Sequence, residues 1–363
     1  MNQRDIIVNF RCVRKTYDGK TLVVKHLDLD VYRGEFLTLL GPSGSGKTTC
    51  LMMLAGFEFP TSGEIWLDDV LLNTIPPQKR GIGMVFQDYA LFPHMTVEQN
   101  VAYPLAARRM PIRGRIERVQ DALRMVRMEH LAKRYPSQLS GGQQQRIALA
   151  RALVFEPKLV LMDEPLGALD KQLREQMQYE LKSLHAELGV TFIYVTHDQS
   201  EALTMSDRVA VFDNGSVQQI DSVERLYETP SNPLVASFVG DSNRFSGTVV
   251  EADGRFCELR LKDGISVRGV KIGNIHAGET VTAIIRPERM WLVDEYRENE
   301  RNIISGKIRR SVYFGDHIRV HFSHSGLDDL FVKIPLNAHA LNELLPGKKI
   351  HIALDPCHFM IFG

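Results

Sequence analysis

The segment GPSGSGKT, from Gly41 to Thr48, follows the apolar run FLTLL at residues 36–40. It fits the phosphate-loop pattern G-x-x-x-x-G-K-[ST] in full, between a predicted buried strand and a helix predicted over residues 48–55. Small residues let such a loop curl so that its N–H groups face phosphate oxygens, and the helix dipole favours the same charge. The segment therefore predicts an α/β nucleotide-binding domain. Its expected phosphate contacts are Gly41, Ser43, Gly44, Ser45, Gly46, Lys47, Thr48 and Thr49.

Four side chains form the first predicted catalytic set. Lys47 has the length to reach the β- and γ-phosphates, and the Thr48 hydroxyl is a ligand for Mg²⁺. The run LVLM at residues 159–162 predicts a second buried strand, and Asp163 and Glu164 follow its carboxyl end, where open α/β sheets bind ligands. We expect Asp163 to hold Mg²⁺ through water and Glu164 to act as general base on the attacking water. Taken alone, the pair also fits an acidic strand-to-loop junction without function.

The chain of 363 residues is long enough for two domains, and its 44% hydrophobic content favours a large core. Strands alternate with helices in the first part, which predicts a parallel or mixed sheet covered on both faces. We expect this domain over residues 1–236, with a helical subdomain at about 90–155. Short strands and glycine turns then predict an all-β barrel, or two small barrels, over residues 242–363.

Composition excludes several classes of function. Lys+Arg and Asp+Glu are both 44, so bulk charge gives no support for a nucleic-acid partner. No stretch approaches the roughly 20 apolar residues of a membrane span, so any membrane role needs partners that supply the spanning helices. The four cysteines contain no C-x-x-C pair and lack the short Cys/His spacing of a zinc site, which predicts reduced thiols. They are Cys12, Cys50, Cys257 and Cys357.

The pentapeptide LSGGQ at residues 139–143 resembles the signature of ABC-type ATPases. The resemblance implies that ATP lies between two copies of the domain in a head-to-tail dimer. In that arrangement the signature contacts the γ-phosphate held by the other copy's phosphate loop. The residues to which this role is carried over are Ser140, Gly141, Gly142 and Gln143.

Four further positions match the same family. Gln87 resembles the glutamine that senses Mg²⁺ and the attacking water, and His197 resembles the switch histidine that contacts the γ-phosphate. Tyr17 resembles the aromatic residue that stacks on adenine, although a core or turn aromatic is the alternative. A lone histidine at a strand end is usually structural, and it is the order of motifs that favours the catalytic interpretation. Asp170 resembles a contact between the two copies; many relatives have Ser where this chain has Gly167.

The tail resembles the small TOBE-type, OB-like barrels on ATPase subunits of binding-protein-dependent importers, and IRPE at residues 285–288 matches a tract of that domain. Exporter ATPases are usually fused to membrane helices, which this chain lacks. The resemblance implies a second copy, two transmembrane permease subunits docked near residues 87–93, and indirectly a solute-binding protein. It also implies a peripheral position at the cytoplasmic face of the inner membrane.

The transported solute is less defined by the sequence. Residues 86–94, 164–170 and 238–243 resemble the spermidine/putrescine group, which favours a polyamine or related cationic amine. Importers of iron, sulfate, phosphonate or sugar share the first two stretches and stay an alternative. A soluble ABC ATPase of DNA repair or translation is a second alternative, but it would usually carry two ATPase domains or a long coiled coil. A binding module without catalysis would be expected to lack Glu164 or His197.

Overall fold

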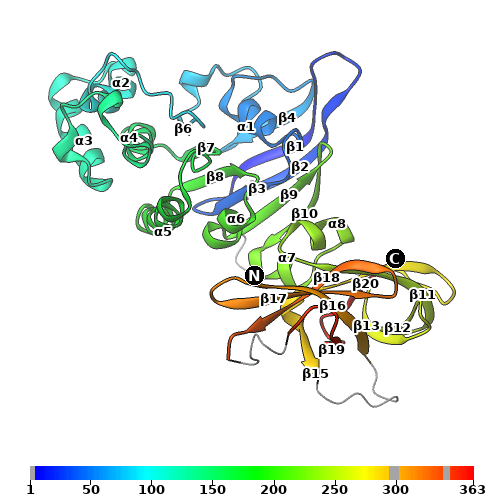
Figure 1. Cartoon of the computed structure of the whole chain (residues 1–363). Coiled ribbons are helices and arrows are strands. Elements are labelled where there is room, and N and C mark those ends of the chain that lie inside the picture. Colours follow the sequence, from blue (N-terminus) through cyan, green and yellow to red (C-terminus); the bar gives the residue numbers. More distant parts are fainter. Residues whose placement is uncertain (1–4, 294–301, 338–343) are drawn as a thin grey trace. The chain divides into compact units, whose positions relative to one another are not determined.

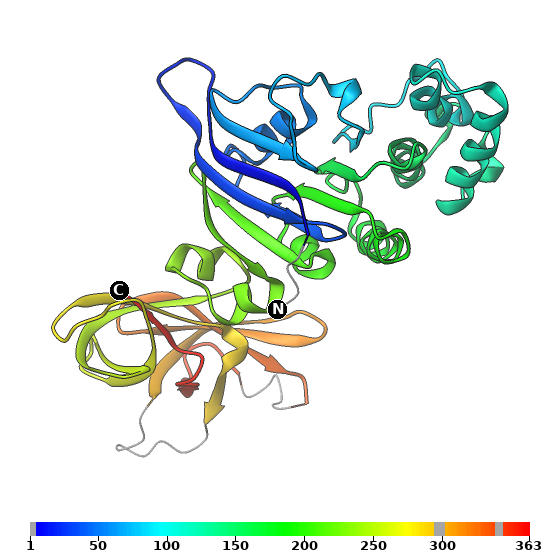
Figure 2. The ribbon, with the colours of Figure 1, turned by 180° about the vertical axis from the view of Figure 1, so that it is seen from behind.

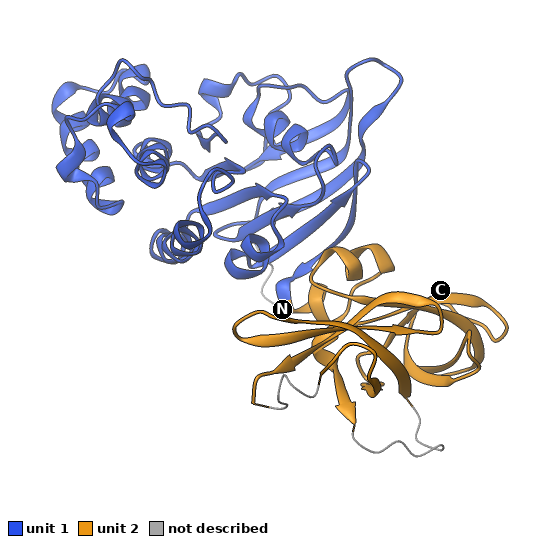
Figure 3. Ribbon diagram, viewed as in Figure 1, with its two compact units in different colours: residues 1–223 blue, residues 224–363 orange. Residues whose placement is uncertain are grey.

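The computed structural model describes residues 5–293, 302–337 and 344–363. It divides into two compact units, Met1–Val223 and Glu224–Gly363 (Figure 1, Figure 3). The short helices α7 (Val223–Glu228) and α8 (Pro233–Phe238) thus fall largely in the second unit, whereas the sequence prediction assigned residues up to 236 to the first. Among the described residues, no helix has the length and apolar character needed to cross a bilayer.

The first unit is built on one ten-stranded sheet with the order β5-β4-β1-β2-β10-β9-β3-β8-β7-β6. Its half from β9 to β6 is parallel, and antiparallel pairs extend it through β1, β2 and β4 (Figure 1). The mixed sheet predicted from the sequence is therefore confirmed. The parallel strands are β3 (Phe36–Leu40), β6 (Ile82–Val85), β7 (Leu159–Asp163), β8 (Thr191–Thr196) and β9 (Arg208–Asp213). The others are β1 (Ile6–Thr16), β2 (Leu22–Tyr32), β4 (Ser62–Leu67), β5 (Val70–Leu71) and β10 (Ser216–Ser222).

Helices cover both faces of the parallel strands. Leu159 and Leu161 of β7 belong to the same core cluster as residues of α1 (Lys47–Ala55). Val160 and Met162, which point the opposite way, pack with residues of α4 (Gly141–Leu153) and α5 (Lys171–Leu188). Because side chains alternate along a strand, a strand buried on both faces must be apolar throughout, as LVLM is.

Residues between β6 and β7 contain the predicted helical region, visible from both sides in Figures 1 and 2. It consists of α2 (Val97–Ala107), α3 (Ile112–Met125) and α4, which enclose a separate apolar core. Thr96 caps α2 and Gln99 completes a capping box. Helix α3 begins right after Pro111, and its first turn is exposed.

The second unit contains a closed five-stranded barrel and a separate five-stranded sheet, so the predicted barrel is confirmed once and the second set of strands forms an open sheet. The barrel strands are β11 (Asn243–Asp253), β12 (Phe256–Leu261), β13 (Ser266–Ile272), β20 (Met360–Phe362) and β14 (Thr280–Ile285). The sheet strands are β15 (Met290–Val293), β19 (Lys349–Leu354), β16 (Ile303–Tyr313), β17 (His317–His324) and β18 (Leu327–Pro335).

A buried arginine ties the two short helices to this barrel. The Arg286 guanidinium donates to the carbonyl oxygens of Ala236 (2.6 Å), Gly240 (3.2 Å) and Asp241 (3.1 Å). These carbonyls belong to the last turn of α8 or follow it, the part of a helix that leaves carbonyl groups without intrahelical partners. Pro233 is the first residue of α8, where its missing N–H costs no hydrogen bond, and Asn232 is the N-cap.

Candidate functional site

The phosphate loop and the two carboxylates meet at one edge of the sheet. Strand β8 pairs with both β3 and β7, with Leu40 opposite Thr196 and Asp163 opposite Val195. The carboxyl ends of the three parallel strands therefore lie level. Across this edge the Thr48 hydroxyl donates a hydrogen bond to Oδ1 of Asp163, at 3.0 Å.

The glycines of the loop are required by its backbone. Gly46 has φ 101°, and a Cβ there would lie 2.8 Å from the carbonyl oxygen of Val23. A Cβ on Gly41 would collide with the carbonyl oxygen of Phe212. Either substitution would move the loop backbone, so these two positions explain why the curl needs residues without side chains.

Lys47 lies at the centre of the loop. Its Nζ donates to the carbonyl oxygens of Gly41 and Pro42, both at 2.8 Å, and lies 3.4 Å from Oγ of Ser45. Burial lowers the pKa of Lys47, while the nearby carboxylates of Glu164 and Asp163 oppose that shift. The buried ammonium is hydrogen-bonded only to neutral carbonyl and hydroxyl oxygens. An anionic phosphate would bind it more strongly, because hydrogen bonds between charged groups are about twice as strong as those between neutral ones.

Asp163 is also buried, and burial raises the pKa of its carboxyl; the Thr48 hydrogen bond acts against that rise. The ionised carboxylate at neutral pH is therefore costly to the fold. A buried carboxyl with a raised pKa is typical of functional sites, because a bound cation would offset the cost of its charge.

Glu164 and His197 form the second contact at this edge. Nδ1 of His197 lies 3.1 Å from Oε1 of Glu164. Glu164 takes φ 44°, an uncommon value for a residue with a side chain, and its N–H donates to the carbonyl oxygen of Val195 at 3.0 Å. The strand thus turns sharply at Glu164, which re-aims the carboxylate toward His197.

The sequence interpretation missed the support beneath His197. The buried carboxylate of Glu201, in α6 (Gln199–Met205), accepts hydrogen bonds from the Tyr194 hydroxyl at 2.8 Å and the Thr196 hydroxyl at 2.6 Å. Asp198 caps the same helix through the N–H groups of Ser200 and Glu201. The helix is thereby fixed against the end of β8. The available signal was Asp198 followed three residues later by Glu201, which is typical of a helix start.

The signature residues begin α4. Ser140 is the N-cap, its hydroxyl accepting from the Gln143 N–H at 3.4 Å while Gln143 Oε1 accepts from the Ser140 N–H at 3.0 Å. Ser140 and Gly141 are exposed, and Gly142 packs beneath Leu173, where a Cβ would approach within 3.1 Å. Among the hydrogen bonds of the described residues, none joins this helix start to the phosphate loop. The helix start is therefore open to the exterior, and the N-terminus of a helix is a position that favours an anion.

Gln87 and Tyr17 are placed differently. Gln87 is exposed in the turn directly after β6, the neighbour of β7, and so emerges at the same sheet edge as Asp163. Tyr17 directly follows β1 and is 59% exposed, with the Lys15 ammonium 4.7 Å from its ring centroid. Ser43 and Gly44 are exposed on the loop, and Thr49 is half-buried in α1. Of the predicted residues, direct side-chain bonds join Thr48 to Asp163 and Glu164 to His197.

Comparison with known proteins assigns the family. Residues 24–167 match the family described as ABC transporter, and residues 283–362 match the TOBE domain. A relative from Trichodesmium erythraeum, the spermidine/putrescine import ATP-binding protein PotA, is 42% identical over 95% of this chain and 92% of its own. The chain belongs to the ABC transporter ATP-binding proteins. PotA of Salmonella typhimurium is 47% identical over 84% of this ABC transporter chain and 80% of its own.

Solved structures agree with the ABC fold of the first unit. The dimeric, post-hydrolysis structure of the ATP-binding cassette MJ0796, bound to ADP and Pi, is 35% identical with a TM-score of 0.54. It covers 60% of this ABC transporter chain and 99% of its own. The cbiO1 structure from Clostridium perfringens, part of the ABC transporter complex cbiONQ, is 31% identical with a TM-score of 0.56, over 61% and 90% of the two chains.

Proposed function

We propose that this chain hydrolyses ATP to energise an ABC importer of polyamines. The observation that carries the catalytic part is the pair of contacts at one sheet edge, Thr48 with Asp163 and Glu164 with His197. The polyamine part rests on relatives named for spermidine/putrescine import, which align over most of both chains. Iron, sulfate, phosphonate and sugar remain alternative solutes because other subunits choose the cargo.

The chemistry follows from the positions of these side chains. Loop N–H groups and Lys47 bind the phosphates, and Glu164 accepts the proton of the attacking water at its carboxylate. His197 fixes the rotamer of that carboxylate from 3.1 Å away and can donate toward the γ-phosphate. Tyr17 offers its exposed ring as a platform for adenine.

Magnesium fits the donors at the loop. The Thr48 hydroxyl and the Asp163 carboxylate converge to 3.0 Å, and both are the hard oxygen donors that Mg²⁺ prefers. Thr48 would hold the ion directly, Asp163 through water, and Gln87 as a further polar partner. When bound, Mg²⁺ neutralises charge on the phosphate oxygens.

The exposed start of α4 requires a second chain in this proposal. Its free N–H groups, together with Ser140 to Gln143, would complete the γ-phosphate site of another copy in a head-to-tail dimer. ATP binding would then draw the copies together, and release of phosphate would part them. Asp170, which caps α5 through the Leu173 N–H at 3.0 Å, would lie at that junction.

The partners would be two permease subunits and, through them, a solute-binding protein, with the chain on the cytoplasmic face of the inner membrane. Residues 87–93 would dock the permease. We propose an ABC ATPase domain at residues 1–236 and a C-terminal β-barrel domain at residues 242–363. The helical subdomain, at about residues 90–155, would take part in the contact with the permease.

The test is ATPase activity in vesicles that contain the permease subunits and the solute-binding protein. We expect spermidine or putrescine to stimulate hydrolysis, and Glu164→Gln to abolish the stimulation. Stimulation by sulfate, iron, phosphonate or a sugar instead would replace the polyamine assignment while retaining the importer. Activity that ignores every solute would favour the alternative of a soluble ABC ATPase.

A further inference from the structure

The ribbon of β1 and β2 contains an irregularity on its exposed face. Between the pairs Phe10–Leu29 and Val13–Leu27, Arg11 and Cys12 together stand opposite the single residue Asp28, which makes a β-bulge. Cys12 takes φ 50°, and its N–H, turned away from the ladder, donates to Oδ1 of Asp28 at 2.7 Å. The bulge therefore holds the cysteine directly against the carboxylate.

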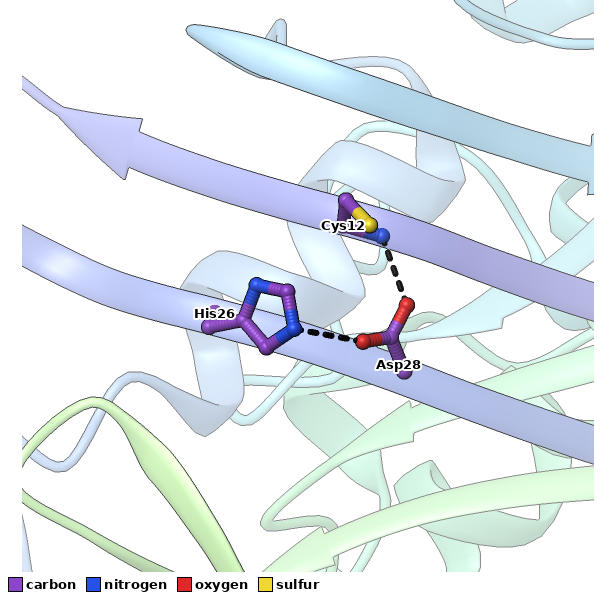
Figure 4. A group of neighbouring side chains, drawn as sticks. All are labelled: Cys12, His26 and Asp28. Atoms are coloured by element: carbon purple, nitrogen blue, oxygen red, sulfur yellow. Dashed lines mark hydrogen bonds and ion pairs between the residues drawn. The ribbon is translucent and has the colours of Figure 1, made fainter.

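A histidine completes this group. His26 lies two residues before Asp28 on β2, so both side chains leave the same face of the strand, while Leu27 between them is buried. Nε2 of His26 lies 2.6 Å from Oδ2 of Asp28. Figure 4 shows the Cys12 thiol, the imidazole and the carboxylate converging above the ribbon. One ligand atom from each lies within 4.8 Å of the others, and no other described His, Cys, Asp or Glu residues form such a trio.

We propose that Cys12, His26 and Asp28 bind a divalent metal ion of the zinc class, with water as the fourth ligand. Thiolate, imidazole and carboxylate are the three protein ligands that zinc uses, and the sulfur disfavours Mg²⁺ and Ca²⁺. Ligand atoms about 2.0–2.3 Å from a tetrahedral ion lie roughly 3–4 Å apart, so side-chain rotation within the 4.8 Å group suffices.

The proton balance of binding is simple. The Cys12 thiol gives up its proton to solvent, and the sulfur forms a bond to the metal. The metal takes the place of the hydrogen between Nε2 of His26 and Oδ2 of Asp28, and both atoms become ligands; that proton leaves to solvent, and the neutral ring carries its hydrogen on Nδ1. Both side chains are exposed, so the loss of their direct contact opposes binding only weakly. Oδ1 of Asp28 keeps the bulge N–H throughout, which holds the carboxylate in place.

The site is separate from the phosphate loop and joins two strands that precede it. A metal bound only to the folded chain stabilises it by mass action. It would tie β1 to β2 at Cys12, five residues before Tyr17 in the chain.

The experiment titrates Co²⁺, a spectroscopic substitute for Zn²⁺, into the full chain without nucleotide. A thiolate ligand gives a sulfur-to-cobalt charge-transfer band, which the oxygen and nitrogen donors around Asp163 cannot produce. We expect the band to saturate at a single Co²⁺ per chain and to bleach on addition of Zn²⁺. It should vanish in Cys12→Ser and persist in Cys357→Ser, the matched control at the other exposed cysteine.

Two further variants separate the ligands from the fold. His26→Ala should weaken Co²⁺ binding at least about tenfold, since even outer partners of metal ligands change affinity by 10–100-fold. Asp28→Asn keeps an acceptor for the Cys12 N–H, so it should retain the melting temperature of the metal-free chain and lose affinity. No band in the wild type, a band that survives Cys12→Ser, or unchanged affinity in His26→Ala would each overturn the proposal.

Discussion

Nδ1 of His197 and Oε1 of Glu164 lie 3.1 Å apart, although they come from loops that follow two different strands. Strands β7 and β8 are neighbours, and the positive φ of Glu164 turns its side chain along the sheet edge. A general base needs one fixed position relative to the attacking water, and the contact with His197 holds the Glu164 carboxylate in such a position.

Glu164→Gln should lower the turnover of ATP by about 10²–10⁴-fold, the usual contribution of general base catalysis. ATP binding should be retained, because Gln keeps the size of the side chain, and a stable ATP-bound dimer should accumulate. Steady-state ATPase assays and size-exclusion chromatography with ATP measure the two effects. Full turnover in this variant would assign the general base to another residue.

Lys47→Ala should weaken ATP binding by roughly 10–100-fold, because a hydrogen bond to a charged group is worth about 1.5–3 kcal/mol. Labelled-ATP binding at equilibrium is the measurement. Lys171→Ala is a matched control, since Lys171 is a lysine with its side chain 89% exposed at the start of α5. Equal affinity of the Lys47 variant and the control would count against the role of the loop lysine.

Asp163→Asn should raise the melting temperature at pH 7 while it abolishes activity. Burial raises the pKa of Asp163 in the folded chain, so the protonated form stabilises the fold at low pH and that stability is lost as pH rises through the raised pKa. Asn is always neutral and still accepts from Thr48. The increase in melting temperature should therefore shrink as the pH falls below the ordinary pKa range of a carboxyl group, where Asp163 is protonated in both the folded and the unfolded chain. Thermal melts across pH measure this dependence. A gain that is the same at every pH would contradict the burial argument.

Tyr17→Ala should weaken ATP binding by about 1–3 kcal/mol, the range for a base stacked on an aromatic ring. Tyr17→Phe keeps the ring and should bind ATP as the wild type does. The residue is 59% exposed, so neither change should alter the melting temperature much. If the Ala variant binds ATP with unchanged affinity, adenine stacks elsewhere.

Local sequence patterns predicted the strands and turns well where the structure of a segment depends on its own residues. The apolar run at residues 36–40 matches β3, and the run at residues 159–162 matches β7. Asn214 and Gly215 adopt the positive φ values that an Asn-Gly hairpin turn requires, between β9 and β10. These features depend on neighbouring residues alone, so the sequence displays them directly.

Features made by distant residues were not predictable in the same way. The trio of Cys12, His26 and Asp28 depends on a bulge that shifts the register of two strands. Cys12 and His26 are too far apart in the sequence for their spacing to indicate a metal site. Glu201 is buried, and its carboxylate accepts hydrogen bonds from Tyr194 and Thr196. A glutamate at a helix start normally faces solvent, so the sequence did not indicate this burial. The second β set stays open as a sheet, because closure depends on which strand edges meet and not on any strand's own pattern.

The pairing of β6 with β7 has a consequence for how such subunits diversify. The chain leaves the sheet at the carboxyl end of β6, after Val85, and returns at Leu159, the amino end of the neighbouring parallel strand β7, so residues 86–158 begin and end on adjacent strands. That excursion has its own apolar core. An excursion that begins and ends on neighbouring strands and has its own core can be exchanged as a unit. A transplant between relatives would carry Gln87, the signature residues and the proposed permease contact with it, while Thr48, Asp163, Glu164 and His197 would stay in place.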